Sequence, residues 1–139
     1  DRYRRLAQEH PDAFLPYLAV SLHNLGARLS ALGRREEALA AAQEAVHLYR
    51  RLAQQHPDAF LPYLARSLGT MGTVLRGMER HGEAADAFAE GVRVLTPFFR
   101  RLPGAFGELM IYLRNNYLEA CRAAGREPDA ALLGPSPDP

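Results

Sequence analysis

The sequence predicts an all-α protein built from stacked antiparallel helix hairpins, and three observations lead to that fold class. The stretch YRRLAQEHPDAFLPYLA at residues 3–19 returns at residues 49–65, with Glu9 replaced by Gln55 as the sole difference. This offset of 46 residues lies in the range that is typical of repeat arrays. Apolar residues also recur at spacings of three and four, which favours helices. No segment alternates apolar and polar residues with period two over a useful length, so no strand is expected.

The helix boundaries follow from prolines and glycines. A first helix should stop before His10-Pro11, because the residue before a proline is pushed out of the α region. The next helix is expected over 12–32, with Asp12 as its N-cap, Pro16 in its first turn and Gly33 following as its C-terminal cap. Its apolar face is a row of leucines: Leu15, Leu18, Leu22, Leu25, Leu29 and Leu32.

The partner of that helix begins near Glu36 and Glu37, whose charges suit a helix N-terminus, and ends at His56-Pro57. The same pattern predicts helices at about 58–78, 82–101 and 104–124, followed by a shortened partner over 127–133. We therefore expect one repeat domain over 1–133, in which 1–10 is the end of a preceding helix. Its units lie at about 12–57, 58–103 and 104–133, and residues 134–139 form a proline-rich tail. Because the chain begins at Asp1, inside a repeat, we expect it to be part of a longer protein.

Composition argues against nucleic acid and membrane as partners. The chain has 17 basic residues, all of them arginine, and 16 acidic ones, so its net charge is +1 and no basic footprint stands out. The arginine pairs at 4–5, 50–51 and 100–101 are interspersed with acids, which favours a solvated face. No apolar run is long enough for a membrane span. The lone Cys121 permits no internal disulfide and is compatible with a reducing cytoplasm, where we expect the protein to reside.

No catalytic or metal-binding constellation is visible. His10 and His56 are copies of one another before a proline, which indicates a structural role at a turn. The other histidines have no partner at ligand spacing, and no phosphate-binding loop occurs. Cys121 occupies the helix position of Leu29 and Leu75, so a buried structural thiol is expected. We expect no enzyme activity, no metal and no cofactor.

The run from Leu22 to Val46 resembles the tetratricopeptide repeat. The positions that carry the resemblance are Leu22, Leu25, Gly26, Leu29, Gly33, Ala38, Ala42 and Ala45, and in the next unit Leu68, Met71, Gly72, Leu75, Ala84, Phe88 and Gly91. Gly26 and Gly72 are costly inside a helix, and close approach of Ala38 and Ala84 would account for them. The usual unit of this family has 34 residues. The 46-residue period therefore resembles a longer-helix variant, found as arrays in large bacterial proteins that often carry regulatory ATPase domains.

The resemblance implies a right-handed superhelix that binds a peptide or protein segment in a concave groove lined by the first helix of each unit. The groove positions it implies are Val20, His23, Ala27 and Ser30, then Arg66, Gly69, Thr73 and Arg76, then Tyr112, Asn115, Glu119 and Arg122. Each set shares one helix face, and the two good copies disagree most there. Drift on a solvated face is the alternative explanation for that disagreement.

We expect Arg66 and Arg76, with the small Gly69 and Thr73 between them, to receive a carboxylate-bearing segment. The family's clamp for chaperone C-termini is not expected, because lysine and asparagine are missing from its positions. An alternative function is a sensor or regulatory array of a larger bacterial ATPase or transcriptional regulator.

The last unit suggests self-association. Repeat arrays need a polar capping helix at each end, and the partner helix after Gly125 is cut short. We therefore expect under-covered apolar residues on helix 104–124, with Met110, Tyr112, Tyr117 and Leu118 as candidates for exposure. Such a surface would join two copies of the chain or receive a continuation of the array.

Overall fold

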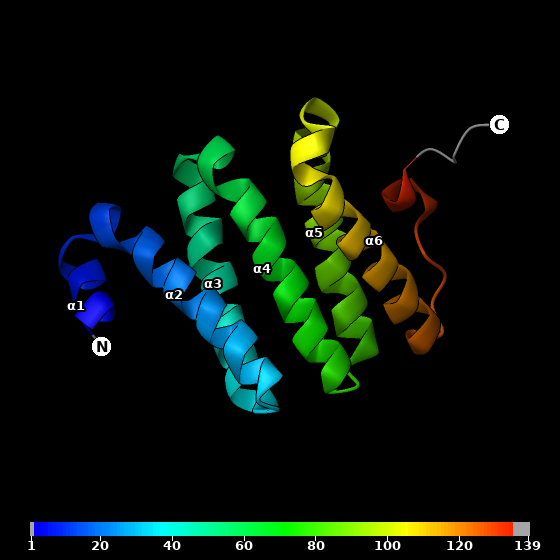
Figure 1. Ribbon diagram of the computed structural model, residues 1–139, viewed down its shortest axis with the longest axis horizontal. Helices are drawn as coiled ribbons and strands as arrows, with labels where there is room; N and C mark the ends of the chain where they lie inside the picture. The colour runs from blue at the N-terminus through cyan, green and yellow to red at the C-terminus, as the bar shows by residue number, and fades with distance from the viewer. Residues whose placement is uncertain (1, 135–139) are drawn as a thin grey trace.

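The computed structural model describes residues 2–134, without the side chains of residues 3, 7, 11 and 12, and it is all-α as the sequence predicts. Its helices run in chain order, each packed on the next (Figure 1). They are α1 (Arg2–Glu9), α2 (Pro11–Ala31), α3 (Arg35–Gln55), α4 (Pro57–Gly77), α5 (His81–Arg101), α6 (Pro103–Ala124) and the short 3₁₀ helix η1 (Ala130–Leu133).

The helices form two layers. The helices α2, α4 and α6 lie side by side in the layer nearer the viewer of Figure 1, where α2 contacts α4 and α4 contacts α6. Behind them, α3 and α5 each pack between two helices of the first layer. The three first helices of the expected units therefore present one common face, which we call the first-layer face.

Each first-layer helix begins one residue earlier than the sequence predicts. The N-caps are His10, His56 and Leu102, none with a side-chain capping bond, and a proline occupies the first helical position each time. Proline suits that position because its fixed φ is already helical and its missing N–H would have no partner there. The expectation of Asp12 as N-cap is therefore wrong, and Pro16 lies in the second turn of α2 rather than the first.

The helix ends repeat with the same 46-residue period. Residues 33, 79 and 125 all adopt a left-handed backbone, with φ of +78°, +60° and +67°. Gly33 and Gly125 fit this geometry because they have no Cβ, whereas the middle copy is Glu79. After Gly33, the N–H of Arg34 returns 2.9 Å to the carbonyl of Leu29, which closes the end of α2.

Ion pairs across the second layer also follow the repeat. Arg4 contacts Glu44, and Arg50 contacts Glu90, so α1 meets α3 through the same pair by which α3 meets α5. Exposed pairs of this kind contribute little stability. They nevertheless show that the repeated sequence reproduces one packing geometry, with α1 in the place of a second-layer helix.

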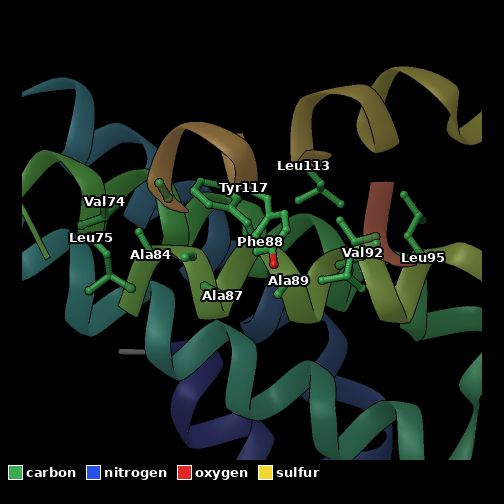
Figure 2. Packing of buried hydrophobic residues seen from close by; sticks show 14 of the residues in the cluster. Val74, Leu75, Ala84, Ala87, Phe88, Ala89, Val92, Leu95, Leu113 and Tyr117 are labelled. Atoms are coloured by element: carbon green, nitrogen blue, oxygen red, sulfur yellow. The ribbon is translucent and has the colours of Figure 1, made fainter. Parts of the chain in front are cut away.

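The core is thickest where α4, α5 and α6 meet. Phe88 is fully buried there, among apolar side chains from α4, α5 and α6, Leu113 and Tyr117 included (Figure 2). Small residues allow the helices to approach. The carbonyl of Ala38 lies 3.4 Å from a Cβ built on Gly26, as expected, but Gly72 faces the Phe88 ring rather than Ala84.

The expected exposure at the C-terminal end is wrong for Met110 and Tyr117, which are 0% and 3% exposed. In place of a shortened helix over 127–133, the chain turns back alongside α6 without regular structure over 126–129 and ends in η1. There Leu132 joins the core, and its carbonyl accepts a hydrogen bond from Nε of Arg114 at 3.1 Å. The backbone N–H of Asp129 donates to the Tyr117 hydroxyl at 2.8 Å. This strap covers the side chains that a missing helix would leave bare.

Candidate functional site

The residues that the sequence places in a groove all lie on the first-layer face. With the exception of Gly69, each is exposed or half-buried, and Val20 and Tyr112 are 43% and 40% exposed despite their apolar bulk. Gly69 is buried because the side chains of Tyr112 and Leu113 cover it, at 3.3 and 3.0 Å from a Cβ built there. The space expected for a ligand at Gly69 is thus filled by α6.

Arg76 is engaged within the protein. Its guanidinium forms an ion pair with Glu119 at 3.0 Å and donates to the side-chain oxygen of Asn116. The amide nitrogen of Asn116 in turn donates 2.8 Å to the carbonyl of Tyr112. A carboxylate ligand would have to displace Glu119, so the C-terminal half of this face favours closure between α4 and α6 over ligand binding.

Thr73 and Tyr112 close the same seam. The Thr73 hydroxyl donates to the Gly69 carbonyl at 3.0 Å, which leaves the Tyr112 hydroxyl to donate to Thr73. The Tyr112 ring also meets Phe88 edge-on, with centroids 6.3 Å apart. Asn115 is exposed beside this seam. These contacts assign a packing role to the two hydroxyl residues expected in the groove.

His23 joins α2 to α4 at the centre of the face. Its Nδ1 lies 3.0 Å from the hydroxyl oxygen of Ser67, which is 1% exposed. Burial lowers the pKa of His23, and the positive charge of Arg66 lowers it further. The imidazole is therefore favoured in its neutral form, which suits a fixed contact between helices.

Two hollows lie on the N-terminal part of the first-layer face. The first hollow, of about 280 Å³ between α2 and α4, is lined by Pro16, Tyr17, Val20, Tyr49, Phe60 and Tyr63. The second hollow, of about 260 Å³ between α4 and α6, is lined by Ala59, Pro62, Tyr63, Arg66, Phe106 and Leu109. Both are open depressions with mainly apolar walls.

The second hollow is the first one displaced by one repeat. Pro16, Tyr17, Val20, Phe60 and Tyr63 correspond, 46 residues on, to Pro62, Tyr63, Arg66, Phe106 and Leu109. Tyr63 lines both hollows. The walls differ in that Arg66 replaces Val20 and Leu109 replaces Tyr63, while Tyr49 lines only the first hollow and Ala59 only the second. The two hollows therefore occupy equivalent places in the repeat and have different chemistry.

Arg66 is the charged wall of the second hollow. It is exposed, and among the residues described its guanidinium has no ion pair or hydrogen bond. Its field acts on neighbouring groups. Burial raises the pKa of Tyr49 to about 12, and Tyr63 adds to that rise, whereas Arg66 opposes it. An anionic group of a ligand would find in Arg66 a cation that no carboxylate of the described side chains neutralises.

The tyrosines and prolines that line the two hollows were not among the residues predicted from the sequence. Tyr17 and Tyr63 are 60% and 47% exposed, one helical turn before Val20 and Arg66 on the same face. Because they lie within the faithfully repeated stretch, they look like part of the joint between units. The available signal was that a large aromatic residue recurs on the groove face at i−3 from the first groove position.

The described side chains form neither a metal-binding cluster nor a membrane-spanning helix. Among residues 2–134, no three histidine, cysteine, aspartate or glutamate side chains lie close enough together to hold a metal ion. In that same range, no helix has the length and apolar character needed to cross a membrane.

Comparison with known proteins supports the repeat architecture. Residues 18–58 match the family model of the tetratricopeptide repeat, a segment that covers most of α2, all of α3 and the start of α4. No curated protein and no solved structure gives a significant match. This match and the sequential pairwise packing of the helices are consistent with a tetratricopeptide-like helical repeat array, and a repeat of this kind implies a general role in protein interaction.

Proposed function

We propose that this protein is a non-catalytic interaction module that binds a segment of another protein across the first-layer face. The observation that carries the proposal is the pair of hollows that the repeat produces, open to solvent and lined by exposed tyrosines. Exposed aromatic side chains next to a cation are the kind of group that dominates binding energy at protein interfaces.

The carboxylate-binding role belongs to Arg66 rather than to a pair of arginines. Arg76 has its own carboxylate in Glu119, whereas Arg66 has none among the residues described. A ligand carboxylate at Arg66 would form a charge-assisted bond without breaking an existing one. The N-terminal part of the face, around residues 17–20 and 63–66, is therefore where we place the ligand.

A displayed library of random peptides, selected on the purified chain, tests this proposal. When the selected peptides bind, the backbone amide signals of the protein that shift should cluster on α2, α4 and α6. Arg66→Glu should weaken acidic binders about tenfold, as expected for loss of a charged interface contact. The matched change Arg93→Glu, at an exposed arginine of the second-layer helix α5, should leave binding unchanged. Binders that map only to α3 and α5 would refute the proposal.

A further inference from the structure

We infer that the two hollows read a proline-containing, acidic segment in the polyproline II conformation. One proline would occupy each hollow, and an acidic residue next to the second would reach Arg66. This inference rests on the proposed function and specifies its ligand. It follows from three features of the hollows, namely their spacing, their walls and their difference in charge.

The spacing of the hollows suits a threefold backbone period. Each hollow lies between consecutive first-layer helices, so the two are one helix-to-helix step apart. Packed helices lie about 8–10 Å apart. A polyproline II segment returns to the same face every third residue, after about 9 Å. A β-strand returns to the same face after two residues, about 7 Å, or after four residues, about 13 Å. Neither distance matches the step of about 8–10 Å between the two hollows.

The walls suit proline rings. Tyr49 and Tyr63 stack with centroids 5.7 Å apart and an interplanar angle of 12°, and Phe60 lies 6.5 Å from each. Pro16 lines the first hollow together with these rings, and the second hollow has Tyr63 and Phe106 among its lining residues. Grooves lined with aromatic rings recognise proline-rich segments, because the ligand loses little conformational entropy when it binds. A cavity of about 260–280 Å³ open on one side accepts a compact ring more readily than a long flexible side chain.

The charge of the ligand follows from which charged side chains beside the hollows already have a partner of opposite charge in the protein. On the opposite face, a third hollow is lined by Glu83, Asp86 and Glu90, but each of these acids already contacts an arginine. On the first-layer face, Arg66 contacts no acid among the residues described. The first hollow has Val20 in the equivalent place. An acidic residue is therefore recognised at the second hollow only, which also fixes the direction of the segment.

The test uses fluorescence anisotropy of short labelled peptides with the full chain. The reference peptide has two prolines three residues apart and an aspartate on each side of the pair. Control peptides carry alanine in place of the prolines, a spacing of four residues, or lysine in place of the aspartates. A further probe is a helix-favouring peptide with apolar residues seven apart, because that spacing also spans about 10 Å.

We expect the reference peptide to bind at least about tenfold more tightly than any control peptide. Tyr63→Ala removes a wall from both hollows and should lower affinity at least about tenfold, whereas Ile111→Ala, at an exposed apolar residue outside both, should not. Arg66→Glu should prefer the lysine peptide to the aspartate peptide. This reversal cannot arise from misfolding, and it keeps the test decisive if Tyr63→Ala is unstable.

Equal affinity for the proline and alanine peptides, or for both spacings, would overturn the inference. So would exclusive binding of the helix-favouring peptide, although amide shifts on α2, α4 and α6 would in that case leave the proposed function standing. Binding of the reference peptide unaffected by both Tyr63→Ala and Arg66→Glu, with shifts on α3 and α5, would overturn the inference and the proposed function together.

Discussion

The glycines at equivalent positions of the two units should respond oppositely to the same substitution. A Cβ built on Gly72 lies 2.8–2.9 Å from three atoms of the Phe88 ring, closer than real Cβ contacts. The ring is fully buried and is held edge-on by Tyr112, so it has little room to withdraw. Overpacking of this kind costs about 1–3 kcal/mol, against a gain of about 1 kcal/mol in helix propensity. We expect Gly72→Ala to destabilise the fold by up to about 2 kcal/mol.

Gly26 is the matched control. One repeat earlier, Ala42 stands in the place of Phe88, and the nearest atoms to a Cβ on Gly26 are 3.4 Å away, at ordinary contact distance. Gly26→Ala should therefore keep most of the propensity gain and stabilise the protein by up to about 1 kcal/mol. The two single variants should differ by about 2 kcal/mol although they carry the same change at the same repeat position.

Thermal and urea unfolding, followed by helical circular dichroism, measure the difference. At about 4 °C per kcal/mol for a domain of this size, the melting temperatures should lie about 8 °C apart. Phe88→Leu shortens the ring that meets the new Cβ, so it should cost less in the Gly72→Ala background than in the wild type. Equal stability of Gly26→Ala and Gly72→Ala, or additive effects in the double variant, would refute the reasoning from the Phe88 contact.

Four further substitutions test the helix ends, the titrating groups and the strap. Glu79→Gly should stabilise the chain by about 0.5–1 kcal/mol in urea unfolding, because φ of +60° strains a residue with a Cβ, whereas Glu79→Ala should not. Stability should fall as pH drops below about 6.5, because the unfolded chain takes up a proton at His23 that the native state resists, and His23→Gln should reduce that fall. Between pH 10 and about 12 the unfolded state loses the Tyr49 proton first, so stability should decline by up to about 2 kcal/mol. Tyr49→Phe should reduce this decline, and the remainder reflects Tyr117, whose pKa burial also raises; no lysine is present to obscure the effect. Leu132→Asp should lower stability by about 2–4 kcal/mol and cause self-association in light scattering, unlike Ala131→Asp at an exposed neighbour.

The helices could be predicted closely because their limits are local. A His-Pro or Leu-Pro junction stops one helix and starts the next whatever surrounds it, and the structure places these junctions at 10–11, 56–57 and 102–103. The error of one residue at each start has a local cause too, since proline takes the first helical position and leaves Asp12 inside the helix. The 46-residue offset and the alignment of equivalent helix positions follow from comparing the sequence with itself.

The C-terminal strap could not be predicted in this way. A shortened helix over 127–133 and bare residues on α6 follow from counting turns, but coverage depends on where an irregular segment lies. Tyr117 is covered because its hydroxyl accepts the N–H of Asp129, and Leu132 reaches the core from η1. Neither contact has a periodic signal, because the third unit has diverged from the other two.

The groove positions expected from the sequence coincide with the lining of the hollows only at Val20 and Arg66, and the reason is physical. Groove positions are expected where the two copies differ, and of these Val20 and Arg66 are exposed and line the hollows. The same criterion discards Tyr17 and Tyr63 because they are identical between copies. Identity within a repeat therefore does not distinguish a side chain that packs the joint from one that lines a hollow beside it.

Repetition can itself produce a binding surface. Residues that define the joint between units, such as Phe60, are copied with the unit, and the next joint recreates a hollow at the equivalent place one helix step further along. Packing within the unit fixes the spacing of the hollows, so that spacing selects the backbone period of a ligand. The few wall positions exempt from packing then select its side chains. The replacements of Val20 by Arg66 and of Tyr63 by Leu109 change the chemistry of a hollow without changing its place in the repeat, so an array of this kind would read successive residues of one extended segment by altering a few wall residues per unit.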